Sequence, residues 1–280
     1  MIKTFSAKTC AFDCEWVPCP ATARRLLNLA QGTSDRAAMD AVWAAYRKPE
    51  DDPASRPFLK LVLSKVVSIS AVLRNVDKDG TVRLVLASIS AANHAEGEMI
   101  QRFLERVATD GYQLWGFNSA SADLPILTQR AMALGVPCPK FSKRPKKPWE
   151  GDDYHDARNS DAHMDILEII GGYGNGARRP KLSELAIACG FPGKLDVDGA
   201  AVADLYLDGR IAEIVEYNET DAVTTHLVML RMGLHTGHLS PERYAAEIAA
   251  VEQLVGEQVT KGKAQFVKFA DAWAAMENGG

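Results

Sequence analysis

The sequence predicts an α/β protein with a mixed five-stranded sheet, in which three antiparallel strands precede the parallel strands and helices flank the sheet. Two observations carry this prediction. Three strand-like segments open the chain, and the turn-forming residues NVDKDG join the second to the third. After them, segments with helical spacing alternate with short apolar segments, an order typical of a sheet covered by helices.

The composition of the 280 residues is that of a soluble globular protein, with 47% hydrophobic and 24% charged residues. No apolar run reaches the length of a membrane span, and the N-terminus MIKTFSAKTC lacks the apolar core of a signal peptide. We therefore expect a cytoplasmic protein with no membrane partner. The five cysteines form no CxxC pair, which argues against a disulfide framework or a structural zinc site.

The first segment, Thr9–Val17 (TCAFDCEWV), is predicted to be a core strand that carries acidic residues. The polar, alanine-rich stretch 21–46 follows and predicts two helices. The proline- and charge-rich stretch Pro49–Pro57 predicts a loop. The β-branched segments Lys65–Leu73 and Thr81–Ile89 predict the two strands of a hairpin.

Helices and short strands alternate in the rest of the predicted domain. The predicted helices are 96–108, 123–135, 181–189 and 211–232, the predicted strands are 112–118 and 163–166, and the basic, proline-rich stretch 137–148 predicts a loop. Ser240 followed by Pro241 predicts the start of a helical tail. The chain is therefore divided into a domain of residues 1–239 with a helical insertion at about 19–57, and a C-terminal helical extension at 240–280.

Two acidic residues, Asp13 and Glu15, lie two positions apart on the first predicted strand. Side chains alternate across a strand, so both carboxylates point to one face. Two acids on an otherwise apolar strand are costly to bury without a cation, and a hard divalent metal is the natural partner. If no other acid joined the pair, an exposed strand end would be the favoured explanation.

Two further acids lie on later elements. Asp221 is one helical turn after Tyr217 on the predicted helix 211–232, so both share a helix face. Asp123 follows the strand ending WGFN, where a parallel strand passes into a helix and where sites in open sheets form. A local cap or salt bridge would explain Asp221, and a helix N-cap would explain Asp123.

Taken together, four carboxylates on three elements are the set that holds two divalent metal ions about 3.5–4 Å apart for phosphodiester cleavage. The order of motifs resembles a known family. FDCEW, WGFNSASADLPIL and EYNETDAVTTHL resemble the three motifs of the DEDD exonucleases in their tyrosine version. The chain also resembles the predicted 3′–5′ exonucleases related to the proofreading domain of family B DNA polymerases.

The resemblance implies an RNase H-like fold, 3′–5′ exonuclease activity and two divalent ions, Mg²⁺ or Mn²⁺. It implies that Asp13 bridges the metals, that Glu15 and Asp221 hold the nucleophile-side metal, and that Asp123 serves the leaving-group metal. Tyr217 would orient the attacking water, and Asp165 would support the site or the fold. Ala122 departs from the usual Phe before the second-motif Asp, and the stretches 19–57 and 240–280 match no motif of the family.

The basic loop Lys140–Lys147 has the aromatic residues Phe141 and Trp149 interleaved with its charges. This combination suits a single nucleic-acid strand, because charge follows the backbone and rings stack on bases. A solvated loop explains it equally well. With Asn118 of the second motif, the predicted nucleic-acid-binding residues are Lys143, Arg144, Lys146, Lys147 and Trp149.

The expected substrate is a nucleic acid, with single-stranded DNA favoured and RNA possible. An inactive nucleic-acid-binding module of the same fold is the first alternative. A glycosidase with paired carboxylates is the second, although two acids on one strand face suit a metal better than they suit flanking a glycosidic bond.

Overall fold

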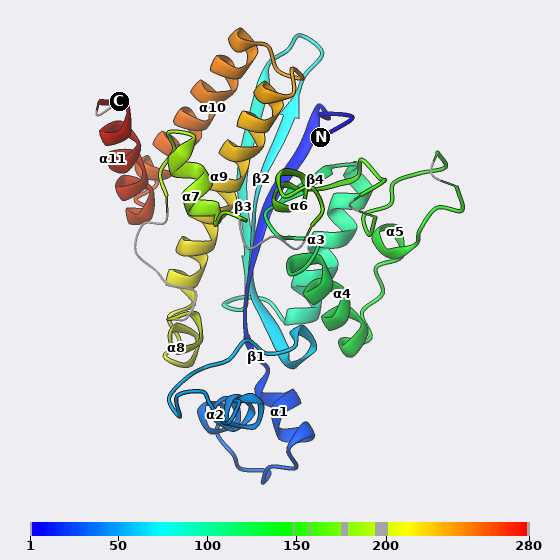
Figure 1. The fold of residues 1–280 in the computed structure, drawn as a ribbon, viewed down its shortest axis with the longest axis vertical. Helices are drawn as coiled ribbons and strands as arrows, with labels where there is room; N and C mark the ends of the chain where they lie inside the picture. The colour runs from blue at the N-terminus through cyan, green and yellow to red at the C-terminus, as the bar shows by residue number, and fades with distance from the viewer. Residues whose placement is uncertain (1, 148, 157, 175–178, 194–200, 279–280) are drawn as a thin grey trace.

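Figure 1 shows the computed structural model of the protein, which describes residues 2–147, 149–156, 158–174, 179–193 and 201–278. Its centre is a five-stranded sheet with the strand order β3-β2-β1-β4-β5. The strands are β1 (Lys8–Pro18), β2 (Ser64–Val76), β3 (Val82–Ser90), β4 (Gln113–Gly116) and β5 (His163–Asp165). The β1–β2 and β2–β3 pairs are antiparallel, whereas β1–β4 and β4–β5 are parallel. The predicted mixed sheet is therefore confirmed.

The alternation of side chains along β1 decides what each face of the sheet contacts. Phe12 and Cys14 are buried in the cluster that includes side chains of α3 (Glu96–Asp110) and α4 (Asp123–Leu134). Ala11 belongs to the opposite cluster, together with apolar side chains of α9 (Ile211–His235). Figure 1 shows α9 on one side of the sheet and α3 and α4 on the other. Asp13 and Glu15 have the parity of Ala11, so they face α9.

The inserted stretch after β1 forms the two predicted helices, α1 (Pro20–Leu26) and α2 (Asp35–Tyr46), which lie beyond the end of β1 in Figure 1. Buried side chains of α2, including Trp43, form a cluster with Val17 and with α8 (Val202–Leu207). The sequence did not predict α8, which is a short helix stabilised by this contact.

The tail after residue 240 forms α10 (Pro241–Thr260) and α11 (Ala264–Asn278). Ser240 caps α10 as predicted, because its hydroxyl accepts the backbone N–H of Arg243 at 3.2 Å. Phe266, Phe269 and Trp273 are buried in the same core cluster as α9. The tail therefore shares its hydrophobic core with the rest of the chain.

Smaller helices fill the connections of the second half: α5 (Pro139–Ser142), α6 (Ile166–Ile170) and α7 (Leu182–Ala188). The prediction of an uninterrupted loop at 137–148 was wrong at α5. Pro139 starts this single turn, and Phe141 is buried with its ring stacked 4.5 Å from that of Tyr154. None of the helices among the described residues combines the length and apolar character that a membrane span requires.

Candidate active site

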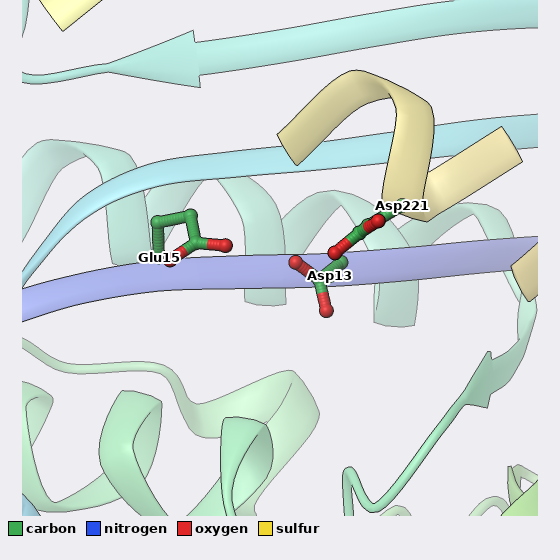
Figure 2. A group of neighbouring side chains, drawn as sticks. All are labelled: Asp13, Glu15 and Asp221. Atoms are coloured by element: carbon green, nitrogen blue, oxygen red, sulfur yellow. The ribbon is translucent and has the colours of Figure 1, made fainter. Parts of the chain in front are cut away.

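Three carboxylates from β1 and α9 meet beside the sheet. Asp13 and Glu15 extend from β1 and Asp221 extends from the adjacent turn of α9, as Figure 2 shows. One carboxylate oxygen from each of them lies within 4.8 Å of the others, and all three residues are partly buried. Strand periodicity places the first two on one face, and the packing of α9 across that face supplies the third.

Asn218 positions Asp13. Its amide nitrogen donates a hydrogen bond to Oδ2 of Asp13 at 2.7 Å. The hydroxyl of Ser68 on β2 donates to the amide oxygen of Asn218 at 2.9 Å, so the amide nitrogen must face the carboxylate. Both supporting residues are fully buried. The sequence analysis missed Asn218, although its position three residues before Asp221 places it on the same helix face.

The electrostatics of this group favour a bound cation. Burial raises the pKa of Asp13 well above its usual value, and the neighbouring carboxylates, led by Asp123, raise it further. A cluster of carboxylate oxygens is the ligand set that Mg²⁺ and Mn²⁺ prefer, and such an ion would relieve the repulsion. The donor set therefore fits a hard divalent metal.

Asp123 lies on the same cleft but is held differently. Its Oδ1 accepts the backbone N–H of Cys14 at 3.0 Å, and the residue is 5% exposed. Burial raises the pKa of Asp123 to about 7, although the hydrogen bond from Cys14 works against the rise. Ala122 is the N-cap of α4 and Asp123 its first residue, so the reading of Asp123 as an N-cap was wrong. Among the described residues, Asp123 is outside the three-carboxylate group.

Asp165 supports the loop that leads from β4 to Asp123. It is buried, and its carboxylate accepts the backbone N–H groups of Asn118 at 3.0 Å and Ala120 at 2.8 Å, as well as two N–H groups at the start of α6. Asn118 adopts a left-handed backbone with φ 64°. A Cβ on Gly116 would lie 2.3 Å from Oγ of Ser119, so the loop can pass this close only over glycine.

Tyr217 is one turn before Asp221 on α9 and lines the cleft with it. Burial and the neighbouring carboxylates, Asp221 foremost, raise the pKa of the Tyr217 hydroxyl well above its usual value. The hydroxyl therefore stays protonated at neutral pH and can donate one hydrogen bond while accepting another.

Residues 56–273 match a protein family described as predicted 3′–5′ exonuclease related to the exonuclease domain of PolB. The chain belongs to this family. The resemblance inferred from the sequence motifs is thereby confirmed. The matched range contains Asp123, Tyr217 and Asp221, and it begins after β1, which carries Asp13 and Glu15. It extends through α10 and most of α11, so the expectation that the stretch 240–280 matches nothing of the family was wrong. No curated protein matches the chain.

The carboxylates open into a cleft of about 600 Å³. The loop after β4 lines it with Phe117, Asn118 and Ala122. The connection from β1 to β2 contributes much of the remaining wall, although sequence analysis assigned it no role. These residues of the connection include Trp43, Arg56, Pro57, Phe58, Leu59 and Leu61.

The four basic residues predicted to bind nucleic acid, and Trp149 with them, are absent from the described lining of the cleft. They are Lys143, Arg144, Lys146 and Lys147. Arg144 forms ion pairs with Asp153 at 2.7 Å and Asp156 at 3.6 Å. Lys147 lies 3.7 Å from Glu150 and 5.5 Å from the ring centroid of Trp149. Acidic residues that follow the loop therefore neutralise part of its positive charge.

Proposed function

We propose that the protein is a metal-dependent 3′–5′ exonuclease that removes nucleotides from nucleic-acid 3′ ends, with single-stranded DNA favoured. The observation that carries this proposal is the convergence of Asp13, Glu15 and Asp221 within 4.8 Å at the edge of a cleft. Membership of an exonuclease family supports both the reaction class and a nucleic-acid substrate.

The proposed metals are two divalent ions, Mg²⁺ or Mn²⁺. Asp13 would contact both, Glu15 and Asp221 would hold one, and Asp123 would serve the other. Such a pair acidifies water and neutralises charge on the leaving oxygen. Asn218 keeps a carboxylate oxygen of Asp13 in place by its 2.7 Å hydrogen bond.

Tyr217 is proposed to align the attacking water. Its hydroxyl remains protonated beside the carboxylates, which suits a group that orients a nucleophile better than one that removes a proton. Asn118 is proposed to contact the nucleic acid, because it lines the cleft and its backbone is held by Asp165.

The basic loop is proposed to contact the strand outside the cleft. Lys143, Arg144, Lys146 and Lys147 would contact phosphates, and the ring of Trp149, which is 78% exposed, would stack on a base. The ion pairs of Arg144 would have to compete with phosphate for its guanidinium.

The division into a domain of residues 1–239 and an extension at 240–280, and the cytoplasmic location, stay predictions. The structure adds that the extension and the domain share one hydrophobic core. We therefore propose that the extension stabilises the exonuclease domain.

The deciding experiment follows degradation of a 5′-labelled single strand in Mg²⁺. A 3′–5′ exonuclease produces a ladder of progressively shorter labelled products, whereas attack from the 5′ end releases the label at once as a mononucleotide. Asp13→Asn is the matched control and should produce no ladder. Tight binding by the wild type without any product would favour the inactive nucleic-acid-binding module, and faster degradation of an RNA strand would favour an RNA exonuclease.

A further inference from the structure

Phe58 is a fully exposed aromatic residue on the wall of the cleft. Its relative exposure is 103%, whereas Leu59 and Leu61 on the same segment are partly buried. Phe58 lines the same cleft as the carboxylates. A ring held in solvent beside a site for nucleic acid is free to stack on a base without first breaking contacts of its own.

Arg56 is the one lysine or arginine among the described residues that line this cleft, which also contains four carboxylates. Its guanidinium lies 4.5 Å from the ring centroid of Trp43. It also donates two hydrogen bonds to the carboxylate of Asp204 on α8, at 2.7 and 2.9 Å. The planar group thus has two partners, and its side chain is still 34% exposed.

Asp204 can share Arg56 with a second anion, because Arg36 lies 3.6 Å from the same carboxylate. If the guanidinium of Arg56 turns toward a phosphate, Arg36 continues to neutralise Asp204. Asp204, whose side chain is 46% exposed, therefore keeps a cationic partner when Arg56 binds a phosphate group.

We propose that Arg56 and Phe58 form the strand-binding wall of the site, with Arg56 contacting a backbone phosphate and Phe58 stacking on a base at or next to the 3′ end. This rests on the proposed nuclease function. It assigns strand recognition inside the cleft to the connection between β1 and β2, not to the basic loop that contains Trp149.

The phosphate contact is tested by fluorescence anisotropy with a labelled oligothymidylate that carries hydrolysis-resistant phosphorothioate linkages, in Mg²⁺ at several salt concentrations. Arg56→Ala should weaken binding and reduce the slope of log K against log salt by about 0.7, the contribution of one phosphate on a single strand. Asp204→Asn is the matched control: it removes the structural partner of Arg56 and should leave the slope unchanged. An equal effect of both substitutions, or no effect of Arg56→Ala, overturns the phosphate contact.

The stacking contact is tested with 2-aminopurine at the 3′ terminus of the same strand. Wild-type protein should quench its fluorescence on binding, and Phe58→Trp should preserve the quenching. Phe58→Ala and Phe58→Leu should abolish it and weaken binding roughly fivefold or more. Trp149→Ala, at another exposed aromatic residue, should leave the quenching intact. Loss of quenching in Trp149→Ala but not in Phe58→Ala assigns stacking to the basic loop and overturns the proposal.

Different results would contradict the nuclease function and the strand-binding wall. If the wild-type protein neither binds nor shortens the strand, the proposed nuclease function is wrong. If it shortens the strand and the Phe58 and Arg56 variants bind it as the wild type does, the nuclease function stands and the strand-binding wall is wrong. Thermal unfolding of each variant near the wild-type temperature confirms that the fold is intact.

Discussion

The amide of Asn218 donates a 2.7 Å hydrogen bond to the carboxylate of Asp13, and the two residues are 205 positions apart in sequence. Ser68 fixes the orientation of that amide. A hydrogen bond to a charged group contributes about 1.5–3 kcal/mol. We therefore expect Asn218→Ala to lower turnover roughly tenfold or more and to weaken Mn²⁺ binding measured by calorimetry.

Ser68→Ala is the matched control for Asn218. This substitution keeps the Asn218 amide that donates to Asp13 and removes only the hydroxyl that orients the amide. We therefore expect smaller decreases in turnover and in Mn²⁺ affinity. Unaltered Mn²⁺ affinity in Asn218→Ala would show that Asn218 only packs between the strand and the helix.

Chelation of divalent ions should abolish nuclease activity, and Mg²⁺ or Mn²⁺ should restore it. Mg²⁺ should also raise the unfolding temperature of the wild-type protein, since a ligand that binds only the folded state stabilises it. Asp13→Asn should lose most activity and most of this shift. It should unfold at a higher temperature than the wild type without metal, because one of several mutually repelling carboxylates is gone. A full Mg²⁺-dependent shift in Asp13→Asn would remove Asp13 from the metal site.

Tyr217→Phe keeps the ring and removes only the hydroxyl. If that hydroxyl aligns the attacking water, turnover should fall roughly ten- to hundredfold, within or below the usual range for one positioned group. The affinities for metal and for substrate should stay unchanged, because the substitution removes no proposed metal ligand. Steady-state kinetics with a labelled strand separates this from a purely structural role, for which turnover would not change.

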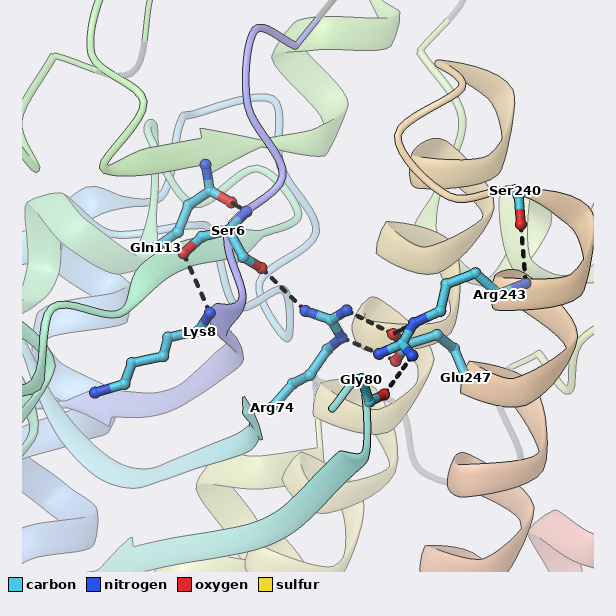
Figure 3. Close-up of polar contacts among 8 residues, drawn as sticks. All are labelled: Ser6, Lys8, Arg74, Gly80, Gln113, Ser240, Arg243 and Glu247. Atoms are coloured by element: carbon cyan, nitrogen blue, oxygen red, sulfur yellow. Dashed lines mark hydrogen bonds and ion pairs between the residues drawn. The ribbon is translucent and has the colours of Figure 1, made fainter. Parts of the chain in front are cut away.

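The tail is anchored by a buried ion pair, shown in Figure 3. Arg74 of β2 donates to Glu247 of α10 at 2.8 and 2.5 Å, and the two side chains are 3% and 0% exposed. Removing one partner leaves a buried charge without its ion pair, so Glu247→Gln should reduce the free energy of unfolding by about 3–5 kcal/mol in urea titrations. The double variant Arg74→Met with Glu247→Leu should recover much of that loss. Equal losses in the single and double variants would contradict this account.

His226 is fully buried on α9, and burial lowers its pKa to about 3. The unfolded chain takes up a proton near pH 6.5 and the folded protein does not, so stability is lost as pH falls below about 6.5. Between pH 7.5 and 5.5 this residue should account for roughly 1.4 kcal/mol of that loss. His226→Gln should show a correspondingly smaller loss in urea titrations at the two values. An identical pH dependence in both proteins would mean that His226 does not remain neutral in the fold.

Local periodicity explains which features were predictable. The alternation along β1 places Asp13 and Glu15 on one face, and the turn of α9 places Tyr217 beside Asp221, because each relation depends on a few neighbouring residues. The five strands and the start of α10 at Ser240 were predictable for the same reason. The one-turn helix α5 was missed because its proline-rich, basic sequence predicts a loop. The contacts of the buried Phe141 ring that stabilise the turn are tertiary contacts.

By itself, the sequence determined the mixed sheet, the family and the candidate carboxylates, because periodicity and motif order can be recognised from the order of residues alone. Only the tertiary structure decided that Asn218 meets Asp13, that Asp123 turns toward the backbone of Cys14, and that Arg56 and Phe58 border the cleft. These contacts join segments far apart in sequence. Their partners are set by how α9 and the inserted segment pack against the sheet, which no local pattern encodes.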